Sequence, residues 1–186
     1  MLSLTLSQLP QASAGRLGWP WTTTTSPLPP RMPNGREWPK ISVVTPNYNY
    51  RRYLEETIRS VLLQGYSNLE YIIIDGGSDD GSLELIEKYQ QWLTWESKPD
   101  AGQSNAINKG LRLATGDILT YLNSDDYYQP GALAQIACMI DAAQDRYVVM
   151  GDINRVSAQG KLARVWKART PTFYSQCFLF IRCQKG

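Results

Sequence analysis

The sequence predicts an α/β domain with a mostly parallel sheet and helices on both of its faces. Short β-branched runs alternate along the chain with segments whose apolar residues recur at helical spacing. The run at residues 70–75 contains three consecutive isoleucines, as in strands of parallel sheets that are buried on both faces. Polar loops follow the strands, at the edge where open parallel sheets bind their ligands. The alternation therefore implies right-handed crossovers and a ligand site at the carboxyl ends of the strands.

The composition limits both the size and the chemistry of this domain. The chain has 186 residues, enough for one domain with a sizeable core and too few for two complete α/β domains. Its net charge of +2 is too small to favour a nucleic acid or an anionic membrane as the partner, so we expect no nucleic-acid binding. The absence of histidine excludes Ser/His/Asp catalysis and histidine metal ligands. Carboxylates are left to carry the chemistry.

The cysteines and the apolar segments bear on the location of the chain. Cys138, Cys177 and Cys183 are an odd number without CxxC spacing, which favours neither a disulfide framework nor a zinc site. The N-terminus lacks the pattern of a signal peptide, and no apolar run reaches the length of a membrane span. We therefore expect a cytoplasmic location, with peripheral association at the inner face of the membrane left open.

The first forty residues differ from the rest. Residues 1–39 are rich in Ser, Thr, Pro and Gly and have no sustained helical or strand period. We expect a disordered Pro/Thr-rich leader here, followed by the folded domain at residues 40–186. The tryptophans Trp19, Trp21 and Trp38 are the features that could dock such a leader onto the domain.

The folded part begins with two strand–helix units. Residues 41–45 form a β-branched run that ends in a turn sequence, which predicts a buried strand. Apolar residues then recur at helical spacing over residues 54–62, and Gly65 supplies a stop. Residues 70–75 predict the second strand, and the apolar residues over 83–93 predict the second helix.

The second half of the chain continues the alternation. Gly116 closes one predicted helix, and Pro130 suits the first turn of another. The predicted elements are a weak strand at 94–96, a helix at 106–114, a strand at 117–122, a helix at 133–140 and a strand at 147–150.

Three of the loops that follow strands carry carboxylates, amides and glycines. They lie at residues 45–49, 75–81 and 123–126. Any one of them is explained by ordinary turn and cap residues. Three such loops at one edge of a sheet instead favour a ligand site.

Several common sites do not fit these loops. The first loop lacks the GxGxxG fingerprint of dinucleotide-binding oxidoreductases, and no P-loop is present. The loop at 75–81 fails as a calcium loop, because Asp80 occupies the place of the turn glycine and Ile86 that of the bidentate glutamate.

A divalent cation would explain the acidic loops. Asp125 and Asp126 are adjacent and repel each other unless one of them binds a cation. Mg²⁺ or Mn²⁺, held by one carboxylate and by substrate phosphates, would allow an acidic edge to bind an anionic substrate. Asp75, at the end of a strand, can accept hydrogen bonds from a base or a ribose, with Thr45 and Asn47 lining the other side.

These motifs together resemble the family-2 glycosyltransferases with the GT-A fold. The segments that carry the resemblance are residues 42–49, 73–81, 100–110, 114–117 and 122–126. It covers about residues 40 to 160. The motifs are specific in combination and weak alone.

The resemblance implies inverting, metal-assisted transfer of a sugar from a nucleoside-diphosphate sugar, with a UDP-sugar favoured, to a glycan or lipid-linked acceptor. The donor-site residues it implies are Thr45, Asn47 and Asp75 at the nucleoside, Asp100 at its border, Asp125 at the ribose or sugar, and Asp126 at the metal. The family often has an arginine where this chain has Ile107, which leaves Lys109 as the candidate phosphate contact.

The sequence offers no clear general base, which an inverting transfer requires. After Asp126 the remaining aspartates are Asp141, Asp145 and Asp152, and none is assigned the role. Residues 173–183 resemble the start of the family's acceptor-side region, and the sequence then stops. We therefore expect a C-terminally truncated glycosyltransferase, and the alternative is a nucleotide-sugar-binding module without catalysis.

Overall fold

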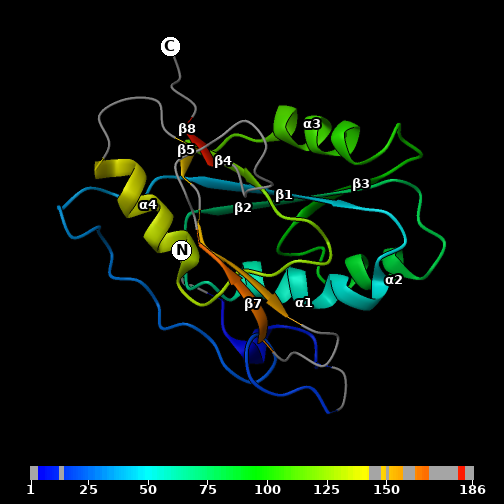
Figure 1. Ribbon diagram of the computed structural model, residues 1–186, viewed down its shortest axis with the longest axis horizontal. Coiled ribbons are helices and arrows are strands. Elements are labelled where there is room, and N and C mark those ends of the chain that lie inside the picture. The colour runs from blue at the N-terminus through cyan, green and yellow to red at the C-terminus, as the bar shows by residue number, and fades with distance from the viewer. Residues whose placement is uncertain are drawn as a thin grey trace.

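A six-stranded sheet forms the centre of the protein in a computed structural model (Figure 1), with the strand order β3-β2-β1-β4-β8-β5. The structure describes residues 4–12, 15–142, 148–149, 151–156, 162–167 and 180–182. The first four strands are β1 (Ile41–Asn47), β2 (Leu69–Asp75), β3 (Thr94–Ser97) and β4 (Ile118–Tyr121). Their mutual pairings are all parallel. The predicted mostly parallel sheet is therefore confirmed.

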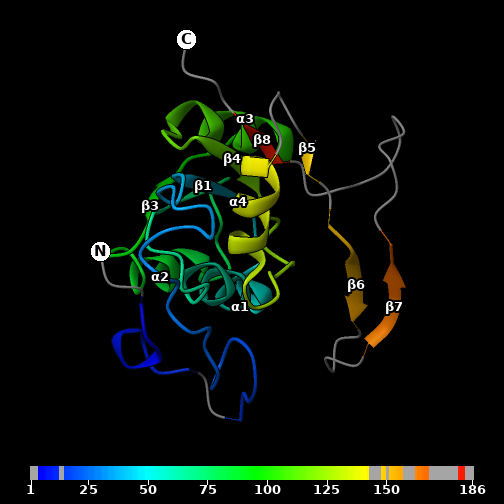
Figure 2. The same ribbon diagram turned by 90° about the vertical axis from the view of Figure 1, so that its left-hand side faces the viewer.

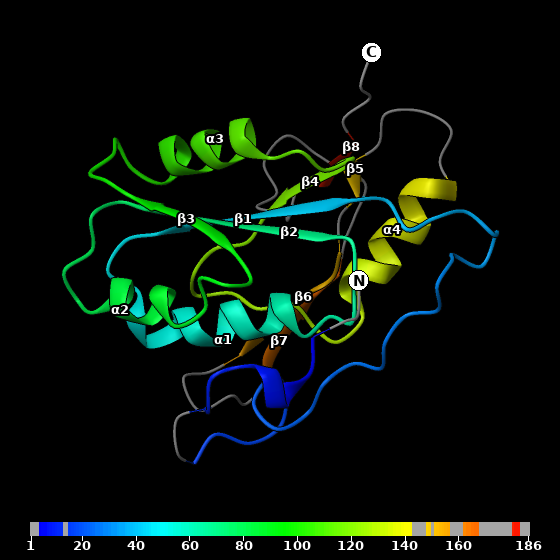
Figure 3. The same cartoon turned by 180° about the vertical axis from the view of Figure 1, so that it is seen from behind.

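Helices cover both faces of this sheet, as the sequence predicted. They are α1 (Arg51–Leu62), α2 (Ser82–Glu87), α3 (Gln103–Leu113) and α4 (Ala132–Ala142). Figure 3 shows α3 on one side of the sheet and α1 and α2 on the other. The apolar residues of α1, α2 and α4 share one large core, whereas Ala106 of α3 belongs to a separate smaller one.

Alternation along β1 explains the two cores. Ile41 and Val43 point into the large core, and Val44 points into the small one beneath α3. At this contact Gly110 of α3 lies against the strand, because a Cβ there would come within 2.3 Å of Val44 Cγ1. The glycine thus sets the close approach of helix and sheet.

The segment before Lys40 departs from the expectation of a disordered leader. It contains the short 3-10 helix η1 (Leu6–Gln8), and Trp21 and Trp38 are only 6% and 8% exposed. The buried Arg59 of α1 explains part of this packing, because its guanidinium donates to the carbonyls of Pro10 at 2.9 Å and Pro20 at 3.2 Å. A buried guanidinium needs such acceptors, and this segment supplies them.

The C-terminal elements extend the sheet in a way the sequence did not predict in full. The strand expected at 147–150 is present as β5 (Val148–Val149), and β8 (Phe180–Arg182) pairs antiparallel with both β5 and β4. The strands β6 (Ile153–Val156) and β7 (Leu162–Trp166) form a separate antiparallel pair, which Figure 2 shows standing clear of the main sheet. No helix in the described ranges is long and apolar enough to cross a membrane.

Candidate functional site

The connectivity of the sheet places a crevice at the carboxyl ends of β1 and β4. The chain runs from β1 outward to β2 and β3, and then crosses back to add β4 on the other side of β1. Open parallel sheets bind ligands at such a switch point, outside the carboxyl ends of the strands. Asn47 ends β1, and the acidic loop, defined here as residues 123–126, follows β4. The loops singled out in the sequence are therefore the ones that border this crevice.

Asp75, at the end of β2, is buried and accepts five hydrogen bonds. The donors are the Asn47 amide at 2.7 Å, the Ser78 hydroxyl at 2.6 Å, the Ser97 hydroxyl at 2.7 Å, and the backbone N–H groups of Gly77 and Ser78 at 3.0 and 2.9 Å. Burial raises the pKa of this carboxyl, but these hydrogen bonds outweigh it and hold the pKa below its usual value. Because two carboxylate oxygens offer about four lone pairs, the loop and the ends of β1 and β3 already use the acceptor capacity expected for a nucleoside.

The other two residues expected at the nucleoside differ in their environment. Thr45 is fully buried, and its hydroxyl lies 3.0 Å from the hydroxyl of Tyr71 within the sheet. Asn47 uses its amide N–H groups on Asp75 and on Ser78, while its Oδ1 is buried and has no hydrogen-bond partner among the described residues. Asn47 therefore keeps one buried acceptor unused, and Thr45 lies inside the core.

Asp100 comes close to the crevice through Gly76. A Cβ at Gly76 would lie 3.3 Å from Tyr48 Cδ2 and 3.5 Å from both carboxylate oxygens of Asp100. The ring of Tyr48 is 61% exposed, and Asp100 accepts a hydrogen bond from the backbone N–H of Gly102 at 2.7 Å. Sequence reasoning assigned no role to Tyr48, although its position directly after β1 was a signal that could have indicated one.

The acidic loop is tied to α3 by a chain of amide contacts. The side chain of Gln103 donates to Asn123 Oδ1 at 2.7 Å, and Asn123 Nδ2 donates to Asp126 Oδ2 at 3.2 Å. Burial, followed by the charge of the neighbouring Asp125, raises the pKa of Asp126 against the opposing effect of the Asn123 hydrogen bond. Asp125 is exposed. The two neighbouring carboxylates thus repel each other, and one of them is half-buried while the other is exposed to solvent.

Polar residues along one face of α1 hold the backbone of this loop. The Thr57 hydroxyl lies 2.9 Å from the carbonyl oxygen of Ser124 and 2.7 Å from that of Asp126. One turn later, the Ser60 hydroxyl accepts the backbone N–H of Tyr128 at 3.1 Å. Thr57 and Ser60 could not be singled out from the sequence, because polar residues within an amphipathic helix ordinarily face solvent.

No cation in the part of the chain that the structure describes neutralises the acidic loop. Neither Asp125 nor Asp126 forms an ion pair with any residue in the described ranges. Lys109, the candidate phosphate contact, instead lies 3.5 Å from Glu96. The described residues contain no group of three or more carboxylate or cysteine side chains that could hold a metal on its own. A cation at this loop would need oxygen ligands from a substrate.

The later aspartates were also located where the structure describes them. Asp141 pairs with Arg36 at 2.9 Å, and Asp152 pairs with Lys167 at 2.5 Å. Asp145 lies outside the described residues, as does most of the acceptor-side segment at 173–183. No general base is therefore assigned.

Comparison with known proteins identifies the family of the chain. A family model described as "Glycosyl transferase family 2" matches residues 42–183, which is most of the chain. The chain belongs to this family. Residues of an uncharacterized glycosyltransferase from Nostoc sp. are 42% identical over 101 positions, covering 52% of this chain and 31% of that protein. The chain therefore spans about a third of the length of this relative.

Solved structures share the GT-A fold with this family-2 chain. One is S. aureus TarS in complex with UDP-GlcNAc, with a TM-score of 0.55, 28% identity, and coverage of 60% of this chain and 33% of that one. Another is the mannosyltransferase PcManGT from Pyrobaculum calidifontis in complex with GDP-Man and Mn²⁺, with a TM-score of 0.51, 25% identity, and coverage of 57% and 33%. The predicted fold class and transferase family are confirmed.

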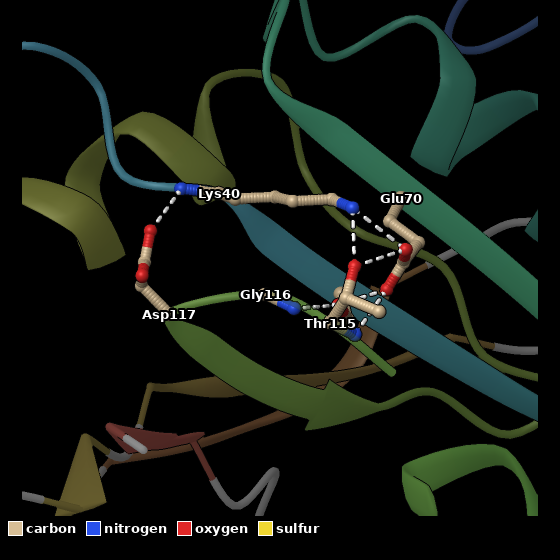
Figure 4. Close-up of polar contacts among 6 residues, drawn as sticks. Lys40, Glu70, Thr115, Gly116 and Asp117 are labelled. Atoms are coloured by element: carbon tan, nitrogen blue, oxygen red, sulfur yellow. Dashed lines mark hydrogen bonds and ion pairs between the residues drawn. The ribbon is translucent and has the colours of Figure 1, made fainter. Parts of the chain in front are cut away.

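One motif of the family-2 resemblance lies away from the crevice. Residues 114–117 precede β4, so they lie at the amino ends of the strands (Figure 4). There Glu70 accepts the ammonium of Lys40 at 2.7 Å, the hydroxyl of Ser42 at 2.5 Å, and both the backbone N–H and the hydroxyl of Thr115 at 2.7 Å. Asp117 accepts the backbone N–H of Lys40 at 2.9 Å. This motif therefore connects β1, β2 and β4 at their amino ends, opposite the candidate site.

Proposed function

We propose that this chain forms the donor-binding part of an inverting, metal-assisted glycosyltransferase. It would transfer a sugar from a nucleoside-diphosphate sugar to a glycan or lipid-linked acceptor. The observation that carries the proposal is the pair Asp125–Asp126, held at the switch point of a family-2 domain and neutralised by no cation among the described residues.

The metal part of the proposal rests on the electrostatics of the acidic loop. A half-buried carboxyl whose pKa is raised by burial and by Asp125 is stabilised when a divalent cation binds it. We assign Mg²⁺ or Mn²⁺ to Asp126, with the remaining oxygens coming from the diphosphate and solvent. When bound, the metal neutralises the charge on the departing diphosphate. The Mn²⁺ in the PcManGT structure supports this choice.

The nucleoside part of the proposal uses Tyr48, Asp100 and Asn47. The exposed ring of Tyr48 offers a face for a base to stack on, and the Asp100 carboxylate beside it can accept an N–H of the base or a ribose hydroxyl. The Asn47 Oδ1 is a second acceptor without a partner among the described residues, but it is buried, so a ligand would reach it only after a local shift of side chains. In this proposal Thr45 and Asp75 shape the pocket from within the fold, and Asp125 faces the ribose or the sugar.

The bound molecules of the solved neighbours support a nucleotide sugar as the donor. TarS is seen with UDP-GlcNAc and with UDP, and PcManGT with GDP-Man. We favour a UDP-sugar for this chain. The proposal also includes a glycan or lipid-linked acceptor and a peripheral position at the inner face of the membrane.

A second candidate is a nucleotide-sugar-binding module without catalysis. It is favoured by the ion pairs of Asp141 with Arg36 and of Asp152 with Lys167, which engage both described aspartates that follow the acidic loop. A carboxylate held in an ion pair is less available to accept the proton of an attacking hydroxyl.

Calorimetric titration of the full chain with UDP and GDP, with and without Mn²⁺, tests the donor site. We expect Mn²⁺-dependent binding that is lost in Asp126→Ala and kept in the matched variant Asp152→Ala, which removes an exposed carboxylate from β6–β7. Nucleotide binding of equal strength in both variants would exclude the metal assignment. Sugar transfer to water, measured with the same chain and a UDP-sugar, would separate the enzyme from the binding module.

A further inference from the structure

A cavity of about 550 Å³ lies between the N-terminal segment, the start of α1, and α2. Its charged lining residues are Arg16, Arg51, Arg52, Lys88, Glu55 and Asp80. Four of these are cationic and two are anionic, so the cavity carries a net positive charge, whereas the acidic loop is negative. None of the residues assigned to the nucleotide-sugar site lines it.

The two carboxylates of the cavity are already engaged by the protein. Asp80 Oδ1 accepts the backbone N–H of Ser82 at 3.0 Å and its hydroxyl at 2.6 Å, and Asp80 Oδ2 accepts the backbone N–H of Arg51 at 2.8 Å. These bonds lower the pKa of Asp80 against a raising effect of burial, and they cap the start of α2. Glu55 accepts the hydroxyl of Tyr89 at 3.0 Å. Both carboxylates therefore serve the local fold.

Three of the four cations have no carboxylate partner among the described residues, whereas Arg16 lies 3.9 Å from Glu56. Arg51 donates to the carbonyl of Gly81 at 2.8 Å, which fixes its guanidinium at the cavity. Arg52 stacks on the ring of Tyr53, with 5.3 Å between the guanidinium carbon and the ring centroid. Within the described ranges, Arg51, Arg52 and Lys88 form no ion pair. Like charges gathered in a concave site raise the local concentration of anions.

We propose that this cavity is a second anion site, which binds a phosphate or diphosphate ester through Arg51, Arg52 and Lys88. Guanidinium groups match the geometry of phosphate oxygens, and an ammonium adds a point charge without directional demands. The volume is within the range of small-ligand sites. Because the N-terminal segment supplies one wall, the site exists only when that segment is docked.

Titration of the full chain with inorganic pyrophosphate tests the site. EDTA is present, so that the acidic loop holds no metal that could attract the anion. We expect the double variant Arg52→Gln/Lys88→Gln to weaken binding at least about tenfold. The control Lys98→Gln, which removes an exposed lysine paired with Glu96 outside the cavity, leaves the affinity unchanged. Equal affinity in the double variant and the control, or no binding to the wild-type chain, overturns the proposal.

A second measurement needs no variant. Pyrophosphate should protect Lys88 from acetylation by acetic anhydride, read out by peptide mapping, while Lys98 stays reactive. Equal modification of Lys88 with and without pyrophosphate contradicts the site. Sedimentation with phosphatidylglycerol vesicles distinguishes the source of the ester, with phosphatidylcholine vesicles as the control. Cosedimentation that is lost in the double variant assigns a lipid headgroup, and pyrophosphate binding without cosedimentation assigns a soluble ester.

Discussion

The hydroxyl of Thr57 lies 2.7 Å from the carbonyl oxygen of Asp126, the residue proposed to hold the metal. The same hydroxyl lies 2.9 Å from the carbonyl oxygen of Ser124. It thus bridges two backbone positions of the acidic loop from the middle of α1. A helix in the core therefore sets the position of a loop at the sheet edge.

Replacing this hydroxyl should loosen the acidic loop. Thr57→Val keeps the shape of the buried side chain but leaves two carbonyls without their donor, and we expect a loss of about 1–2 kcal/mol of unfolding free energy. The Mn²⁺-dependent affinity for UDP should fall with it. Urea unfolding and calorimetry measure the two effects. Thr57→Ser, which retains the donor, should keep the UDP affinity. If Thr57→Val changes neither the unfolding free energy nor the UDP affinity, the bridge has no energetic role.

The charge on Asp126 should destabilise the metal-free protein. Because burial and Asp125 raise its pKa in the folded state, the native state favours the protonated carboxyl. Its contribution to stability is present below the unfolded pKa and is lost as the pH rises through the folded pKa. In EDTA at neutral pH, Asp126→Asn should therefore melt at a higher temperature than wild type. This advantage should vanish near pH 4, and Asp152→Asn serves as the control in the same scans.

Added Mn²⁺ should reverse the order of the melting temperatures of wild type and Asp126→Asn. The cation stabilises the wild-type loop by binding its ionised carboxylate, and the asparagine variant lacks this ligand. We expect the melting temperature of wild type to rise with Mn²⁺ concentration and that of Asp126→Asn to stay constant. Equal shifts in both proteins would place the metal elsewhere.

Glu70, at the amino ends of the strands, should make the unfolding free energy of the protein depend on pH in the acid range. Burial raises its pKa, but the hydrogen bonds from Lys40, Ser42 and Thr115 outweigh burial and lower the pKa to about 2, from an ordinary value of 4.5. A depressed pKa contributes stability that is present above pH 4.5 and is lost as the pH falls toward 2. Glu70→Gln should cost about 2 kcal/mol at neutral pH.

The pH dependence supplies the check on this prediction. The difference in unfolding free energy between Glu70→Gln and wild type should shrink as the pH falls from 4.5 toward 2. Glu87→Gln, an exposed change on α2, is the matched control and should show no such convergence. A constant difference at every pH would mean that the lost contacts do not depend on the ionised carboxylate.

The N-terminal segment should be part of the folded unit. Trp21→Ala removes a buried side chain and should cost about 3 kcal/mol, whereas Leu17→Ala, at a residue that is 80% exposed, should change stability by less than about 0.5 kcal/mol. Chemical denaturation of the two variants measures the contrast. If both substitutions are silent, the segment is the disordered leader that its composition suggested.

The contact between Gly110 and Val44 should couple two positions that lie far apart in the sequence. Gly110→Ala places a methyl group 2.3 Å from Val44 Cγ1, and overpacking of this kind costs about 1–3 kcal/mol. Val44→Ala makes room for it, so the double variant should be more stable than the sum of the two single changes predicts. A double-mutant cycle by urea unfolding measures this coupling, and strict additivity would contradict the close approach.

The regular part of the fold could be predicted from the sequence because its signals are local. The β-branched runs and helical stripes predicted the four parallel strands and the helices α1, α3 and α4 within a few residues, whereas α2 ends at Glu87 although the apolar pattern continues to residue 93. By contrast, β8 lies between β4 and β5 and pairs antiparallel with both. It is far from β4 in the sequence, and no local period indicates such a partner. The docking of Trp21 likewise depends on Arg59, which is a property of the tertiary structure.

The candidate site could be predicted as a location more readily than as a set of contacts. Strand ends predicted which loops meet, and the structure brings Asn47, Asp75 and Asp100 to one edge, with the acidic loop beside them. The sequence could not show that the carboxylate oxygens of Asp75 accept hydrogen bonds from neighbouring protein groups, or that Thr45 faces the core. Both facts depend on side-chain direction at the end of a strand, which residue type alone does not determine.

The packing of the N-terminal segment also constrains the order in which the chain can mature. Trp19 donates its indole N–H to the carbonyl of Tyr128, a residue 109 positions later in the sequence. Synthesis proceeds toward the C-terminus, so Trp19 is made well before the carbonyl that accepts its N–H. During that interval the indole of Trp19 lacks this acceptor, and forming the contact closes a long loop. Trp19 is thus among the residues that reach their native contacts late in folding.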